Sequence, residues 1–85
     1  MPAWVVHPSH AAVIDALVKA RNAAGITQRD VATKLGKPPS FVAKVESIER
    51  NLSVLEFMAW SRVLGVEPGK ILAAGTRGLR SEGQI

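Results

Sequence analysis

The side chains with the clearest binding chemistry in this sequence are a glutamine and several basic residues near its centre. Gln28 can donate an amide N–H to a phosphate oxygen, and Arg29 and Lys37 can add positive charge beside it. Further along, Ser40 and Lys44 are four residues apart, so on a helix they point the same way. Donors and cations in this combination are suited to binding a phosphate-bearing partner.

Groupings that could support catalysis or hold a metal are not apparent. His7 and His10 are the two histidines; they are three residues apart near the N-terminus, with no third ligand close in sequence. The chain has no cysteine, which excludes a thiolate zinc site and a cysteine nucleophile, and it has no glycine-rich phosphate loop. We therefore expect no enzyme, no metal and no cofactor.

Length and composition predict one small domain with an aliphatic core. The chain has 85 residues, of which 47% are hydrophobic, but it has only two Trp, two Phe and no Tyr. This composition is suited to a bundle of short helices. A domain of this size is near the lower limit for folding alone, so dimerisation would help. The net charge of +4 is compatible with nucleic acid as a partner but does not identify one.

Three absences predict a cytoplasmic protein. The lack of cysteine fits a reducing compartment. No apolar run approaches the roughly 20 residues of a membrane helix. The N-terminus lacks the basic segment and the long apolar stretch that are typical of a signal peptide.

Glycines and prolines divide the chain into five predicted helices. The first begins with Ser9 as N-cap and continues to Ala24, and Gly25 ends it. Its predicted apolar stripe consists of Val13, Leu17 and Ala20 or Ala24. We expect residues 1–9 to form an N-terminal arm, residues 10–74 the folded domain and residues 75–85 a flexible tail.

The second and third helices are short and separated by a tight turn. Thr27 and Asp30 are typical of a capping box, and they open a helix of about eight residues that ends at Gly36. Pro39 is suited to the first position of the next helix, which we expect to end near Ser47. The residues expected to face the core are Val31, Ala32, Leu35, Val42 and Val45. Those expected to face outward are Ser40, Ala43 and Lys44.

Two further helices complete the predicted domain. After a loop over residues 48–52, Ser53 and Glu56 form a full capping box for a helix that ends at Leu64, before Gly65. Within it, Trp60 is expected in the core or in a dimer interface. A fifth helix is expected to open at Glu67-Pro68, to bury Ile71 and Leu72, and to end near Gly75. In the arm, an apolar patch is expected to cover one end of the core or to pair with a partner subunit; it consists of Trp4, Val5 and Val6.

Two short helices joined by a glycine-containing turn follow the helix-turn-helix plan. The second helix enters a DNA major groove roughly 12 Å wide, so it needs small or polar residues on its outer side. The first helix offers its N-terminus, with free N–H groups and the positive end of its dipole, to a phosphate. Thr27 and Gln28 occupy that N-terminus here.

The chain resembles the Cro/C1-repressor (XRE) helix-turn-helix family over roughly residues 10–74. The segments that carry the resemblance are Gly25–Ala32 with Leu35-Gly36, Pro39–Glu46, Glu49–Phe57 and Val63–Val66. It implies an all-α, five-helix, lambda-repressor-like domain that binds double-stranded operator DNA, usually as a homodimer on a palindrome. For a single-domain member we expect a transcription repressor that occludes a promoter.

The resemblance also implies roles for individual positions. It places base reading on Pro39, Ser40, Ala43 and Lys44. With the helix-turn-helix geometry, it places phosphate contacts on Thr27, Gln28, Arg29, Lys37, Arg50 and Asn51, the last two in a loop with Glu49 that meets the DNA backbone. It implies a buried structural ion pair between Arg21 and Glu46.

Three positions depart from the family pattern. Relatives often carry Gln or Ser at Pro39 and Ser at Ala43, so two hydrogen-bonding side chains are missing from the reading face. A glycine common in the following loop is Ile48 here. Direct readout would then rest on Ser40 and Lys44, with more of the specificity coming from DNA shape or bridging water.

Two alternatives remain open at this point. The same domain occurs in antitoxins that neutralise a toxin protein and also repress their own operon. The departures at Pro39 and Ala43 also allow a protein-interaction module that has lost DNA binding.

Overall fold

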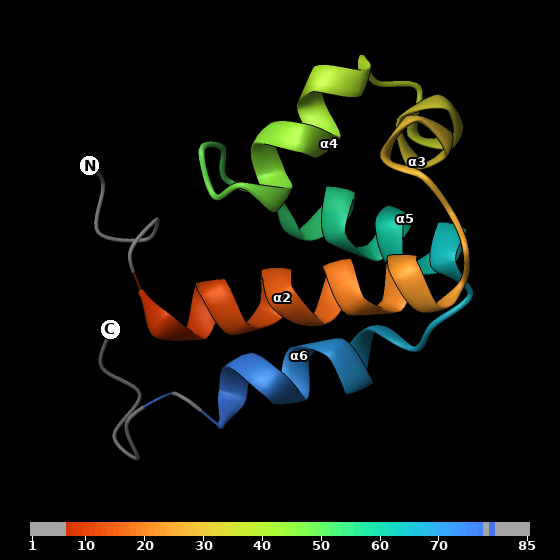
Figure 1. Cartoon of the computed structure of the whole chain (residues 1–85). Helices are drawn as coiled ribbons and strands as arrows, with labels where there is room; N and C mark the ends of the chain where they lie inside the picture. The colour runs from red at the N-terminus through yellow and green to blue at the C-terminus, as the bar shows by residue number, and fades with distance from the viewer. Residues whose placement is uncertain (1–6, 78, 80–85) are drawn as a thin grey trace.

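The computed structural model describes residues 7–77 and 79, and over these residues it contains five α-helices and no strand (Figure 1). The helices are α2 (Pro8–Ala23), α3 (Gln28–Leu35), α4 (Pro39–Glu46), α5 (Val54–Leu64) and α6 (Pro68–Thr76). The predicted all-α, five-helix fold is therefore confirmed. Among the described helices, none has the length and hydropathy needed to span a membrane.

The helices form one bundle in which chain neighbours are not always spatial neighbours. The first and last described helices, α2 and α6, lie side by side and make the most extensive contact in the molecule (Figure 1). At the other end, α3 packs against both α4 and α5. The α3–α4 pair therefore projects from a base made by α2, α5 and α6.

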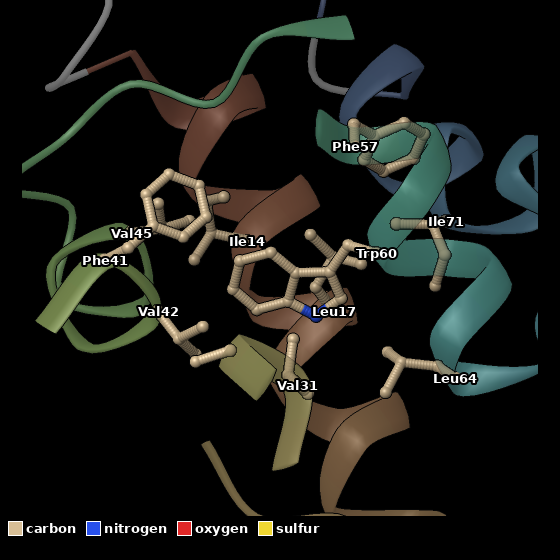
Figure 2. Packing of buried hydrophobic residues seen from close by; sticks show 11 residues of the cluster. Ile14, Leu17, Val31, Phe41, Val42, Val45, Phe57, Trp60, Leu64 and Ile71 are labelled. Carbon is tan, nitrogen blue, oxygen red and sulfur yellow. The ribbon is translucent and has the colours of Figure 1, made fainter. Parts of the chain in front are cut away.

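A single hydrophobic core joins all five helices around Trp60. The indole is completely buried, so Trp60 belongs to the core rather than to a surface. Figure 2 shows the ring surrounded by side chains from every described helix. These include Ile14, Leu17, Val31, Val42, Phe57 and Ile71. Because α3 and α4 have only eight residues each, this shared core is what stabilises them.

The start of the first helix differs from the prediction. Helix α2 begins at Pro8, and the N-cap is His7, whose Nδ1 accepts a hydrogen bond from the Ser9 backbone N–H at 3.0 Å. Proline favours the first helical position because its φ is already helical and it has no N–H to satisfy. Ser9 is thus a buried residue of the first turn and not the cap, and Pro8 and Ser9 belong to the helix rather than to the arm expected over residues 1–9. The apolar patch predicted at Trp4, Val5 and Val6 lies outside the described residues.

The end of the domain also differs from the prediction. Helix α6 continues to Thr76, so Gly75 and Thr76 are helical residues and not the start of a tail. Gly75 is buried against α2: a Cβ built on it would lie 2.5 Å from Val13 Cγ2 and 2.9 Å from the Ser9 carbonyl oxygen. Leu72, predicted to face the core, is 46% exposed, whereas Ile71 is buried as predicted. Most of the predicted tail lies outside the described residues.

Candidate nucleic-acid interface

The turn between α3 and α4 sets the angle at which α4 leaves the bundle. Gly36 ends α3 with φ +68° and ψ +32°, a left-handed conformation that costs glycine little. The Lys37 N–H donates to the Ala32 carbonyl at 2.9 Å, which closes the turn. Pro38 then adopts an extended conformation as the N-cap, and Pro39 is the first residue of α4. The predicted helix-turn-helix element is present in the structure.

Helix α4 has an anchored side and a free side. Val42 and Val45 have no exposed surface, and Phe41 is also buried, so the inner side is fixed in the core. The four residues predicted to read bases are all exposed on the opposite side: Pro39, Ser40, Ala43 and Lys44. The side chains of Ser40 and Lys44 make no hydrogen bond or ion pair with any described residue, so their donors are available to a partner.

At the N-terminus of α3, the predicted capping box is formed in both directions. The Asp30 N–H donates to Thr27 Oγ1 at 3.0 Å, and the Thr27 N–H donates to Asp30 Oδ2 at 3.1 Å. The hydrogen bond from the Thr27 N–H is the main cause that lowers the pKa of Asp30 below its usual value. The Thr27 side chain also hydrogen-bonds the Asp30 carboxylate, so this end of α3 offers a partner the exposed cation of Arg29 beside one carboxylate.

Gln28 is held by a network that joins three helices. Arg21 of α2 and Glu46 of α4 form a two-point ion pair, with Nε–Oε2 at 2.6 Å and Nη2–Oε1 at 3.0 Å, and Arg21 Nη1 also donates to the Ile26 carbonyl at 2.9 Å. Gln28 Nε2 donates to Glu46 Oε1 at 2.8 Å. The amide predicted to contact phosphate thus has one donor committed to Glu46 and one left over.

Lys37, before α4, and Arg50, after it, both lie close to the Glu56 carboxylate and to the Phe41 ring. Lys37 Nζ and Arg50 Nη1 lie 3.6 and 3.4 Å from the Glu56 oxygens. The same two cations lie over the Phe41 ring, with Lys37 Nζ 5.4 Å and Arg50 Cζ 4.4 Å from its centroid. We call Lys37, Phe41, Arg50 and Glu56 the Glu56 cluster. The cluster has a formal net charge of +1 and keeps two cations beside α4.

The loop after α4 is shaped by an unusual residue. Ile48 has φ +61°, the left-handed conformation that favours glycine, and this is the position where the family commonly has glycine. Its side chain packs against the core, which offsets the backbone strain. In the same loop Asn51 Oδ1 accepts from the Leu52 N–H at 2.8 Å, and Glu49 accepts from the Ser47 hydroxyl. The Asn51 amide N–H₂ group remains available to a partner.

The structure places the predicted site residues at the N-terminus of α3, in the turn before α4, on the exposed side of α4 and in the loop after it. It adds Glu56 and Phe41 to this region. Glu56 was recognised as a helix cap, and its ion pairs with Lys37 and Arg50 were missed because they join residues from three separate segments. The sequence also did not predict that the Phe41 ring is a platform for the Lys37 and Arg50 cations. The spacing of Lys37 and Phe41, four residues apart, was the available signal.

Among residues 7–77 and 79, no three side chains of His, Cys, Asp or Glu gather in a way that could hold a metal ion. His7 has a different role, since its Nδ1 caps α2.

Comparisons with known proteins identify the family. A family model described as helix-turn-helix matches residues 17–71, which include the whole α3–α4 unit. An XRE-family like protein from Pseudomonas syringae pv. tomato str. DC3000 has a similar solved structure, with 45% sequence identity, a TM-score of 0.75, and coverage of 81% of this chain and 84% of that chain. A search of curated proteins gives no match. The chain belongs to the Cro/C1-type (XRE) helix-turn-helix family of DNA-binding transcription regulators.

Proposed function

We propose that this regulator is a repressor that binds a palindromic operator as a homodimer, with α4 in the major groove. The observation that carries the proposal is the division of α4 into a side fixed by Val42 and Val45 and a side that leaves Ser40 and Lys44 exposed and unpaired. A rigid helix with small and polar outer residues fits the groove. Two such helices, about 34 Å apart in a dimer, would meet successive major grooves.

Phosphate contacts would hold this helix in register. The proposed donors are Thr27, Gln28, Arg29, Lys37, Arg50 and Asn51. They lie at the N-terminus of α3, in the turn before α4 and in the loop after it, so they flank the reading helix on both sides. Because cations displace counterions from DNA, we expect binding to weaken steeply as salt rises.

Fluorescence anisotropy with labelled DNA tests the proposal. It compares a fragment from immediately upstream of the protein's own gene with a scrambled fragment, each at two salt concentrations. We expect preference for the upstream fragment. Lys44→Ala should weaken this specific binding by about 1–3 kcal/mol, roughly 5- to 150-fold, and affect the scrambled fragment less. Lys19→Ala is the matched control, since Lys19 is an exposed lysine of α2 that pairs with Asp15.

Two outcomes would contradict the proposal. Absence of binding to either DNA at low salt would rule out DNA recognition by α4 and favour a module for protein interaction. An equal loss of specific binding in Lys19→Ala and Lys44→Ala would show that base reading does not depend on α4.

A further inference from the structure

The Glu56 carboxylate is held in place by the first turn of its own helix. Its Oε1 accepts from the Ser53 N–H at 2.9 Å, and the Glu56 N–H donates to Ser53 Oγ at 3.1 Å. The Glu56 side chain is only 18% exposed. The next residue, Phe57, and Trp60 one turn along are buried in the core, so the start of α5 is anchored as well. Glu56 therefore provides an anion in a fixed position beside the cations of the Glu56 cluster.

The two cations of the cluster are on long side chains that are only half-buried. The Lys37 and Arg50 side chains expose 41% and 43% of their surface. A long basic side chain loses rotamer freedom when a partner immobilises it, and this loss weakens binding. Here the Glu56 carboxylate on one side and the Phe41 ring on the other already restrict both side chains. Part of their entropy is thus lost when the chain folds and not when it binds DNA.

The contacts with Glu56 leave most donors of both cations unused. Arg50 Nη1 is shared between Glu56 Oε1 and the Asn51 carbonyl, the latter at 2.8 Å, whereas its Nε and Nη2 groups donate to no described residue. Lys37 Nζ lies 3.6 Å from Glu56 Oε2, which is an ion-pair distance but longer than a hydrogen bond. The remaining N–H groups can donate to phosphate oxygens while both cations stay beside the carboxylate.

We propose that Glu56 is a positioning residue for DNA binding, which holds Lys37 before α4 and Arg50 after it in fixed places for the phosphates of the operator. This inference rests on the proposed function, which assigns both cations to phosphate contacts. Cations in fixed places favour DNA that is in register with α4, because only there do its phosphates lie opposite them. On other DNA the fixed geometry gains nothing, and the carboxylate only weakens the attraction for the backbone. Glu56 thus increases specificity rather than overall affinity.

Glu56→Gln tests this role in anisotropy measurements with the upstream and the scrambled fragment. Glutamine also caps a helix from this position, so the variant keeps the local fold and removes the charge that holds the two cations. We expect tighter binding to the scrambled fragment and weaker binding to the upstream one, so that the ratio of the two affinities falls about tenfold. Asp15→Asn is the control matched in charge, since it also releases a lysine, but on α2. That variant should leave the ratio unchanged.

A double-mutant cycle distinguishes positioning from a merely structural role. In a protein that carries Lys37→Ala and Arg50→Ala, Glu56→Gln should no longer change the ratio, because no cations are left to hold. Ser40 and Lys44 remain in that protein, so a preference for the upstream fragment can still be measured. Circular dichroism melts establish that each variant is folded at the temperature of the assay.

Two results would overturn the inference while leaving DNA recognition through α4 unaffected. One is a wild-type ratio in Glu56→Gln, and the other is an equal fall of the ratio with and without the two cations. A wild-type protein that shows no preference for the upstream fragment would instead contradict the proposed function, and this inference with it.

Discussion

Glu46 connects three helices through one carboxylate. It accepts from Arg21 of α2 at two points and from Gln28 of α3, while its own helix carries the exposed Ser40 and Lys44. The exposed fractions of the Arg21 and Glu46 side chains are 13% and 8%, so solvent screens the pair only weakly. This network fixes the angle between α3 and α4 and also the orientation of Gln28.

We predict that Glu46→Ala lowers the melting temperature substantially. Removing one partner of a largely buried pair leaves Arg21 uncompensated, which costs about 3 kcal/mol. For a domain of this size, that cost lowers the melting temperature by roughly 10 to 25 °C. Asp15→Ala is the control: it removes the exposed Lys19–Asp15 pair, which contributes about 0–1 kcal/mol. A Glu46→Ala melt equal to that of the wild type would show that the ion pair has no structural role.

At the scale of elements, the contact between α2 and α6 depends on one small residue. Gly75 lets the two helices approach until the position of its missing Cβ is 2.9 Å from the Ser9 carbonyl oxygen, which is backbone and cannot rotate away. This close contact holds α6 against the bundle and so contributes to the base from which α3 and α4 project.

We predict that Gly75→Ala destabilises the protein by about 1–3 kcal/mol, because the two helices must move apart to accept the methyl group. Gly69→Ala in the same helix is the matched control. No atom lies within 4 Å of the position of its Cβ, so the gain in helix propensity should leave stability unchanged or slightly raised. Chemical denaturation of both variants measures the difference. Equal stability of the two would show that the α2–α6 contact tolerates a larger residue.

The stability of the whole domain depends on pH through two capping carboxylates, Asp30 and Glu56. The pKa of Asp30 is lowered mainly by the Thr27 N–H, and the pKa of Glu56 is lowered mainly by the Ser53 N–H, with a further contribution from Arg50. A carboxyl whose pKa is lower in the folded state binds its proton more readily in the unfolded state. Its contribution to stability is therefore complete above the unfolded pKa and is lost as pH falls through the folded pKa.

We predict that the melting temperature falls as pH decreases below about 4, near the ordinary pKa values of Asp and Glu, and that Asp30→Asn with Glu56→Gln makes this fall shallower. The double variant should already melt lower at pH 7, because an amide is a weaker acceptor for the capping N–H groups. Asp15→Asn serves as control, since that carboxylate forms only an exposed pair with Lys19, which contributes about 0–1 kcal/mol. If the double variant and the wild type lose stability in parallel on acidification, other groups govern the acid response.

Features that depend on short-range chemistry could be predicted from the residue pattern alone. Three kinds of feature follow from residues within one helical turn of each other. They are the capping boxes at Thr27 and Ser53, the helix ends at Gly36 and Gly65, and the outward position of Ser40 and Lys44. Such features are local because a capping hydrogen bond joins residues three apart and because the period of a helix fixes which side chains share a side. They were sufficient to predict the all-α fold and the exposed side of α4.

Contacts between side chains from different segments could be identified only in the folded chain. Glu56 is a local cap in the sequence, yet in the fold it also gathers Lys37 and Arg50 around Phe41. Gly75 reads as the start of a tail until α2 is placed beside it. Leu72 and Leu55 fit an apolar pattern as well as their buried neighbours do, and they are exposed because the core around Trp60 is already filled from other directions. Packing between distant segments determines these contacts and exposures, and no local pattern encodes that packing.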